Sequence, residues 1–196
     1  DNLLADQEMD KITRHHFLSE VSRQLTGMSW LIATMLKLSR LEAGVVELGR
    51  EPVEAARLVE ECAARLQTAA EWRDVSLEMR LQPGASLTAD EKWTLEALCN
   101  IVKNAIEHSP GGSRVQIETA ENEIYTEIRV TDSGTGISRE ERQKLFQRFD
   151  RGGNAAEDSV GIGLALAKAV VEQQHGHIQV DSEEGKGTVF SLKFMK

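Results

Sequence analysis

The sequence is poor in aromatic residues and in proline. Phenylalanine, tyrosine and tryptophan make up 5% of its 196 residues, and there are 3 prolines. A core must therefore consist mainly of Leu, Ile, Val and Ala, a composition that suits helices packed against a sheet. With 40% hydrophobic and 28% charged residues, the composition indicates a folded chain.

Cysteine is also scarce. The two cysteines, Cys62 and Cys99, each lie in an apolar helical pattern. This number excludes a disulfide framework, and no residues have the spacing of metal ligands. We expect buried free thiols, which fit a reducing compartment.

Basic residues are outnumbered, with 23 Lys and Arg against 32 Asp and Glu, and the net charge is -9. This balance argues against nucleic acid as the main partner. A nucleotide site remains compatible, because backbone N–H groups and a metal ion can hold a triphosphate locally. No apolar run reaches the roughly 20 residues that cross a bilayer, and no signal peptide opens the chain. Because it begins with Asp1 rather than Met, we expect an excerpt of a longer protein.

The longest periodic segment covers residues 11–43. Its apolar residues alternate in spacings of three and four, which predicts a helix with one apolar stripe. The stripe consists of Leu18, Val21, Leu25, Met28, Ile32 and Met35, widened by Leu31, Leu38 and Leu41. Such a helix must pack on a partner helix from this chain or from another. Gly44 is a plausible end of the helix.

Downstream, helices and strands are interleaved. Helices are predicted over residues 53–72 (opened by Pro52), from a cap at Asp90 to 108, from a cap at Ser138 to 146, and over 164–175. Strands are predicted over 75–81, 115–119, 124–131, 178–181 and 188–194. Short turns between strands predict an α+β fold with a mixed sheet covered by helices on one face. The polar segment 150–159 is expected to be mobile.

Two motifs in this predicted α+β region carry residue types that suit ligand binding. Asn100 and Asn104 are four apart, so both amides lie on one helical face, and amide oxygens suit Mg²⁺. Solvated or capping asparagines are the alternative. Asp132 follows a strand and precedes Gly134 and Gly136, which permit close backbone approach to a ligand. Its carboxylate can accept a hydrogen bond from the exocyclic amine of a base, and a plain turn is the alternative.

Two further glycine motifs follow. Gly161 and Gly163 enter a helix, where exposed N–H groups and the helix dipole favour phosphate. The motif is not a Rossmann fingerprint, and the chain has no Walker lysine motif. The last motif is Gly185-Lys186-Gly187-Thr188, which by itself is a glycine turn.

In this order the four motifs resemble the N, G1, G2 and G3 boxes of sensor histidine kinases, and Phe146 and Phe149 match the F box between them. The resemblance covers residues 47–196 and implies a Bergerat-type α/β sandwich that binds ATP, with residues 150–159 as the lid. Upstream, residues 38–44 look like the end of a dimerisation and phosphoacceptor hairpin. Residues 1–46 would then be a partial helical segment, which in the family packs into a four-helix bundle.

The resemblance implies a role for each matched residue. Asn104 would hold Mg²⁺, Asn100 would contact the phosphates or the metal shell, and Asp132 would read the adenine amino group. Thr188 would reach the Asp132 end of the pocket through water. The backbone of four glycines would touch base or phosphate: Gly134, Gly136, Gly161 and Gly163. The other residues implied in nucleotide binding are His108, Ile137, Phe149, Arg151 and Leu164, with Arg148 as a further candidate for neutralising phosphate charge.

The resemblance also distinguishes a kinase from a hydrolase by the residue at the position of Asn100. Related ATPases carry a water-activating glutamate at the position of Asn100, and an amide cannot act as a base. Glu96, one turn earlier, is the nearest carboxylate that could replace it. Two positions depart from the family pattern: Glu107, where lysine is frequent, and His177, where glycine is common. Lys103 is expected to be solvated.

A phosphoacceptor histidine is not evident. His15 and His16 do not lie in a segment that resembles Ser-His-Glu-Leu-Arg-Thr-Pro-Leu, in which the family's acceptor histidine usually stands. We expect both to be solvated histidines on a helix. We therefore expect the cytoplasmic catalytic part of a membrane-anchored sensor kinase that uses Mg-ATP. It would form a homodimer through the N-terminal helix and feed a response-regulator receiver domain. A slow ATPase and a nucleotide-dependent dimerisation module are the alternatives.

Overall fold

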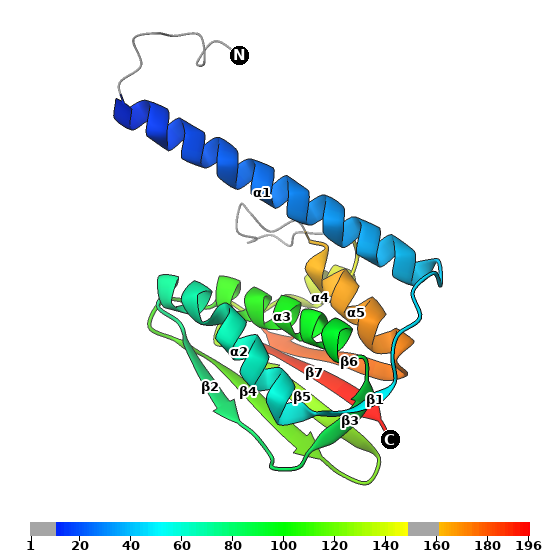
Figure 1. The fold of residues 1–196 in the computed structure, drawn as a ribbon. Coiled ribbons are helices and arrows are strands. Elements are labelled where there is room, and N and C mark those ends of the chain that lie inside the picture. Colours follow the sequence, from blue (N-terminus) through cyan, green and yellow to red (C-terminus); the bar gives the residue numbers. More distant parts are fainter. Residues whose placement is uncertain (1–10, 149–160) are drawn as a thin grey trace.

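A five-stranded mixed sheet forms the centre of the molecule, whose computed structural model describes residues 11–148 and 161–196 (Figure 1). The strand order is β2-β4-β5-β7-β6, with β2 and β4 parallel and the other pairs antiparallel. The bounds are β2 Ser76–Arg80, β4 Arg114–Glu121, β5 Tyr125–Thr131, β6 Gly176–Glu183 and β7 Gly187–Met195. The predicted mixed sheet is confirmed.

Three helices cover one face of this sheet: α2 (Ala55–Trp72), α3 (Glu91–His108) and α5 (Gly163–Gln173). Alternate residues of the central strands point toward them and are buried, because successive side chains of a strand lie on opposite faces. The buried strand residues include Val115, Ile117, Ile128, Val130, Phe190, Leu192 and Phe194. The predicted α+β class, with helices on one face, is therefore confirmed.

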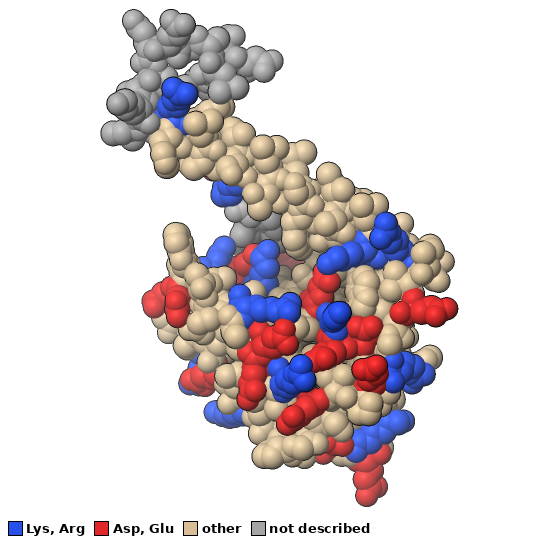
Figure 2. Space-filling view, in the orientation of Figure 1, with Lys and Arg blue, Asp and Glu red and all other residues tan. Residues whose placement is uncertain are grey.

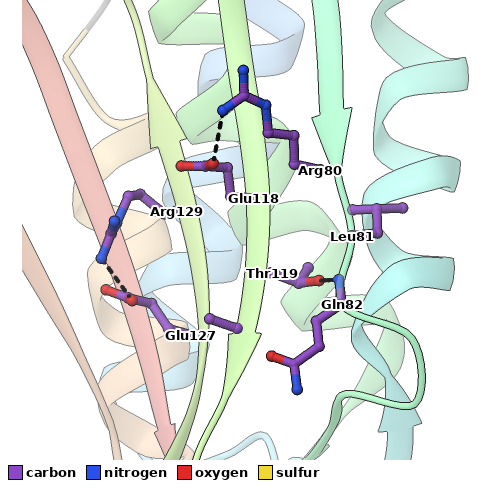
Figure 3. A pocket seen from close by; sticks show the side chains of 8 residues that line it. Arg80, Leu81, Gln82, Glu118, Thr119, Glu127 and Arg129 are labelled. Carbon is purple, nitrogen blue, oxygen red and sulfur yellow. Dashed lines mark hydrogen bonds and ion pairs between the residues drawn. The ribbon is translucent and has the colours of Figure 1, made fainter.

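The opposite face of the sheet carries charged side chains (Figure 3). Arg129 pairs with the buried Glu127 at 2.9 Å, and Arg80 lies 3.8 Å from Glu118 on the neighbouring strand. A hollow opens beside them where the chain leaves β2 at Gln82. This face is held by pairs of opposite charge and contributes no apolar core.

A two-stranded ribbon, β1 (Glu51–Glu54) with β3 (Ser86–Ala89), was not predicted. The prediction that Pro52 opens a helix at 53 is wrong, because Pro52 lies in β1 and α2 begins at Ala55. Proline is tolerated here because β1 pairs with only one strand and its other edge is free. Four-residue strands are too short to give a clear alternating pattern.

Two predicted helix caps are confirmed. The Asp90 side chain accepts a hydrogen bond from the N–H of Trp93 at 3.1 Å and so caps α3. Ser138 forms a capping box with Glu141 at the start of α4 (Arg139–Lys144), which ends two residues before the predicted Phe146. The last helix ends at Gln173, because the backbone turns to positive φ at His175.

The predicted N-terminal helix is α1 (Lys11–Glu42), and its final part packs on its own chain. Thr34, Leu38 and Leu41 are buried, and the Gln173 side chain of α5 donates a hydrogen bond to the Leu41 carbonyl at 2.5 Å. Leu38 and Leu41, predicted to widen the apolar stripe, thus pack on helices of the same chain, which is one of the two kinds of partner expected for this helix. Gly44 follows with φ +65, consistent with a helix end.

Most of the remaining stripe on α1 is exposed, and Leu31 is half-buried. The exposed fractions are 59% for Leu25, 58% for Met28 and 56% for Ile32, and this helix carries few charges in the view of Figure 2. His15 and His16 are exposed on the same helix, as predicted. No helix in the described ranges combines the length and apolarity that a membrane span requires.

Candidate functional site

Asp132 lies just beyond the end of β5 and is 4% exposed. Its Oδ1 atom accepts two backbone hydrogen bonds, from the N–H of Gly134 at 2.8 Å and from the N–H of Thr188 at 3.1 Å. Its own N–H donates to the Thr188 carbonyl at 2.9 Å. Two of these bonds hold the carboxylate and the third holds the backbone of Asp132, so the residue is fixed between the end of β5 and the start of β7.

The second oxygen of this carboxylate, Oδ2, has no hydrogen-bond partner among residues 11–148 and 161–196. Every fully buried side-chain nitrogen or oxygen in those ranges does have a partner. The Oδ2 atom of Asp132 therefore keeps some accessible surface. It is an oriented acceptor that can receive an N–H group from a ligand.

Burial raises the pKa of the Asp132 carboxyl above its ordinary value. The hydrogen bonds from Gly134 and Thr188 and the charge of His108 lower the pKa, but they do not cancel the loss of hydration. In the ligand-free protein, the hydrogen bonds and the nearby charge thus do not fully replace the hydration that the ionised carboxylate loses on burial. Such carboxylates are frequent at functional sites.

The loop after Asp132 is pressed against its neighbours at two glycines. A Cβ atom on Gly134 would lie 2.5 Å from the carbonyl oxygen of His108, at the end of α3. One on Gly136, which has φ +71, would lie 2.1 Å from the carbonyl oxygen of Glu183. Glycine is therefore required for the backbone to pass between α3 and the β6–β7 hairpin.

Two further residues support this loop: Gly187, which the sequence analysis placed in the last glycine motif without a role in the site, and Ser182, which it did not single out. Gly187 has φ +94, and a Cβ atom there would lie 2.1 Å from the Asp132 carbonyl oxygen. The Ser182 hydroxyl accepts a hydrogen bond from the N–H of Ile137 at 2.9 Å and lies 3.0 Å from the Thr188 hydroxyl. The spacing of Gly187 in its motif was a usable signal, whereas a serine within a strand gives none. Thr188 thus reaches Asp132 directly through its backbone, and its side chain meets Ser182.

Asn100, Asn104 and His108 follow one another along one face of α3 and are half-buried. No described residue donates a hydrogen bond to these side chains or accepts one from them. Gly163 is close to this row, because a Cβ atom on it would lie 3.1 Å from Oδ1 of Asn100. The amide oxygen of Asn100 therefore lies close to the start of α5.

In the described part of the chain, nothing accepts a hydrogen bond from the N–H groups of Gly163 and Leu164 at the start of α5. Its N-cap, Ile162, makes no side-chain cap, and a helix leaves its first N–H groups, here including those of Gly163 and Leu164, without intrahelical acceptors. Such groups, together with the helix dipole, favour phosphate. Gly161 directly precedes them with φ +68.

Contacts thus link α3 to the Gly134 loop, α3 to the start of α5, and Asp132 to β7. Phe149, Arg151 and the predicted lid 150–159 lie outside the described residues. Arg148 forms an ion pair with Glu42 of α1, so the structure does not assign it to the site. Lys103 is exposed, as predicted, and its Nζ also lies 5.0 Å from the centroid of the Trp30 ring.

The amide oxygens of α3 and the backbone N–H groups at the start of α5 suit a nucleotide that is bound together with a hard metal ion. The described residues hold no group of three His, Cys, Asp or Glu side chains that could bind a metal by themselves. Amide oxygens beside a row of free backbone N–H groups suit a metal that keeps water and phosphate ligands, as Mg²⁺ does.

Comparison with known proteins gives concordant results. The sequence profile of the family described as histidine kinase-, DNA gyrase B-, and HSP90-like ATPase matches residues 89–196. The chain is 33% identical over 193 residues to the sensor-like histidine kinase SenX3 of Mycobacterium tuberculosis H37Rv, covering 97% of this chain and 47% of SenX3. It is 31% identical over 183 residues to the heme sensor protein HssS of Staphylococcus saprophyticus, covering 93% of this chain and 39% of HssS.

Solved structures share the fold. The Acinetobacter baumannii histidine kinase AdeS superposes with a TM-score of 0.77 at 22% identity, covering 96% of this chain and 86% of AdeS. Full-length ShkA in complex with AMPPNP superposes with a TM-score of 0.78 at 22% identity, covering 96% of this chain and 40% of ShkA. The Bergerat-type sandwich with a preceding long helix, predicted from the boxes, is thereby confirmed.

Replacing Gly136 by alanine should destabilise the protein more than replacing Gly185. Both glycines have positive φ, which costs alanine about 1–2 kcal/mol, but a Cβ atom on Gly185 meets nothing within 4 Å. The additional cost at Gly136 should be about 1–3 kcal/mol, because its Cβ atom would overlap the Glu183 backbone. Urea unfolding of the two variants measures the difference, and equal losses would contradict the close approach.

Asp132→Asn should raise the free energy of unfolding at neutral pH. The amide keeps an oxygen for the Gly134 and Thr188 N–H groups and removes the poorly hydrated charge. Since the folded-state pKa of Asp132 is raised, the wild-type penalty is absent below the unfolded-state pKa and grows as pH rises through the folded-state value. The gain should therefore be larger at pH 7 than at pH 4 in urea titrations.

Asp181→Asn, at an exposed position on β6, is the matched control and should change stability little at either pH. A gain for Asp132→Asn that is independent of pH, or a loss at pH 7, would refute this account of the buried carboxylate.

Proposed function

Since this chain belongs to the family of histidine kinase-, DNA gyrase B-, and HSP90-like ATPases, we propose that it is the ATP-binding catalytic part of a sensor histidine kinase. The family match over residues 89–196 includes α3, Asp132 and α5. The chain spans 47% of SenX3 and 39% of HssS, so the activity of the whole protein is part of the proposal. The observation that carries it is the fixed Asp132 carboxylate, with one oxygen free, beside the amide row of α3.

In this proposal the adenine amino group donates a hydrogen bond to Oδ2 of Asp132. Gly134 and Gly136 let the loop after Asp132 pack closely on α3 and on the β6–β7 hairpin, so that its backbone can lie beside the base. The phosphates lie at the start of α5, where backbone N–H groups are free. AMPPNP, which is bound in the ShkA structure of the same fold, is a ligand of this chemical class.

Asn104 would hold Mg²⁺ through its amide oxygen, and Asn100 would contact the phosphates or the metal shell. When bound, the ion supplies positive charge that offsets charge developing on the phosphates. The protein side chains of this row supply orientation and not proton transfer, because an amide is not a base at neutral pH. Phosphoryl transfer depends mainly on such positioning and charge neutralisation.

The nucleophile in the proposed reaction is a histidine nitrogen. It forms a bond to the γ-phosphorus while the bond to the β,γ-bridging oxygen breaks and ADP leaves. His15 and His16 are exposed on α1, but they lack the expected acceptor segment, and we assign the acceptor to a helical hairpin outside this sequence. The phosphoryl group would then pass to an aspartate of a response-regulator receiver domain in the cytoplasm, where ATP is available.

The exposed stripe of α1 is proposed to bind a second copy of this chain. Leu25, Met28 and Ile32 are each more than half exposed, although such residues at helical spacing normally pack on another helix. The opposite side of α1 is already occupied, since Leu38 and Leu41 pack on the domain that carries the site. A homodimer through α1 would cover the remaining apolar surface.

A slow ATPase and a nucleotide-dependent dimerisation module remain the alternatives. The amide at Asn100 disfavours efficient hydrolysis. The fixed Asp132 and the backbone N–H groups at the start of α5 disfavour a module that has lost its nucleotide chemistry. Steady-state ATPase and transfer assays separate these functions from the kinase.

The chain should bind Mg-ADP and phosphorylate a separately added acceptor hairpin from γ-labelled ATP, with little labelling of itself. Asp132→Asn should weaken Mg-ADP binding about 10- to 100-fold in calorimetry, because a hydrogen bond to a charged group contributes about 1.5–3 kcal/mol. Strong acid-labile self-labelling that His16→Ala abolishes would overturn the assignment of the acceptor. No affinity for ADP in millimolar Mg²⁺ would overturn the function.

Ile32→Glu should convert the dimer to a monomer in multi-angle light scattering, because it puts a charge into the apolar stripe. Ala33→Glu is the matched control: the same charge is added one residue away, at an exposed position outside the stripe, and the dimer should persist. A monomeric wild type, or equal effects of the two variants, would contradict dimerisation through this stripe.

A further inference from the structure

An ion pair joins α1 to the helix that carries the amide row. The Lys37 Nζ atom lies 2.6 Å from Oε1 and 2.8 Å from Oε2 of Glu96. Glu96 is on α3, one turn before Asn100. Both oxygens of this carboxylate are therefore engaged by a cation that belongs to another element.

Glu96 is the carboxylate best located to interfere with the site. It shares a spacing of four with Asn100 and Asn104, so the three side chains lie along one side of α3. The two other glutamates of this helix are also paired: Glu91 lies 3.2 Å from Arg57, and Glu107 lies 3.6 Å from Lys103. Only Glu96 combines a place one turn from Asn100 with a partner on α1.

The ion pair restricts the Glu96 side chain, because both carboxylate oxygens lie within hydrogen-bond distance of the same Nζ atom. The pair directs the carboxylate toward Lys37 on α1, whereas Asn100, one turn later, lies beside Gly163 at the start of α5. If Lys37 were absent, the Glu96 side chain would be free to turn along its helix toward Asn100.

We propose that Lys37 is a positioning residue that restrains the Glu96 carboxylate, so that docking of α1 suppresses hydrolysis of the nucleotide bound beside Asn100. This inference rests on the proposed function of the site. In the suppressed reaction, a water oxygen bonds to the γ-phosphorus and its proton passes to Glu96. The bond to the β,γ-bridging oxygen breaks, and ADP and inorganic phosphate leave.

The other contacts of α1 make the ion pair depend on docking. The final turns of α1 are held by the Gln173 side chain on the Leu41 carbonyl and by Arg148 on Glu42, and an earlier turn is held by Lys103 over Trp30. When α1 leaves this surface, Lys37 leaves with it. Docking would thus keep ATP intact for the histidine.

Steady-state hydrolysis of Mg-ATP by Lys37→Met, Glu96→Gln and the double variant tests the inference. Lys37→Met should raise kcat by about tenfold or more, since a positioned general base contributes about 10²–10⁴, with KM and Mg-ADP affinity unchanged. Adding Glu96→Gln should remove the rise, because an amide cannot take the proton. Lys37→Arg, which keeps the cation, should stay near the wild-type rate.

Arg57→Met is the matched control. It breaks the exposed ion pair between Arg57 of α2 and Glu91 of α3, the helix that also carries Glu96, and it should leave hydrolysis unchanged. An unchanged kcat in Lys37→Met with intact ADP binding would overturn the inference. So would a rise that persists in the double variant, which would trace the effect to undocking alone. Absence of ADP binding by the wild type would instead overturn the proposed function, and this inference with it.

Discussion

The organisation of the site depends on one interaction: the capture of Oδ1 of Asp132 by two backbone N–H groups, from Gly134 and Thr188. Because these donors come from the loop after β5 and from the start of β7, a single oxygen joins two segments that are distant in sequence. The cost is a carboxylate in a poorly hydrated place. The benefit is that the other oxygen is held in one direction before any ligand arrives, so little ordering remains for binding to impose.

Much of this arrangement could be predicted, and the part that could not has physical reasons. The site was predicted because the order of Asn100, Asp132, Gly134 and Gly163 resembles the boxes of sensor histidine kinases, whereas each motif alone left a structural alternative open. The glycines could be read because alanine cannot replace them where backbones nearly touch. Ser182 could not, since a serine in an alternating strand is equally compatible with solvent.

Tertiary contacts also determine features of the structure that the local sequence pattern does not specify. Leu38 and Leu41 continue the helical periodicity that includes Leu25, yet they lie on another side of α1 and are buried on α5 and its surroundings while Leu25 is exposed. Periodicity gives a helical face but not the surface that covers it. Similarly, Pro52 is compatible with a first helical turn and with an edge strand, and the pairing with β3 selects the strand. The role of Arg148 depended on Glu42, a residue more than one hundred positions earlier.

The parallel pairing of β2 with β4 has a consequence for how the chain reaches its fold. Antiparallel neighbours such as β6 and β7 are joined by a tight turn and can meet early, whereas β2 can pair only after β3 and the whole of α3 have been made and have crossed over. Loop closure of that kind slows folding. During synthesis on the ribosome, β2 is therefore an unpaired edge until the segment that carries both asparagines has emerged.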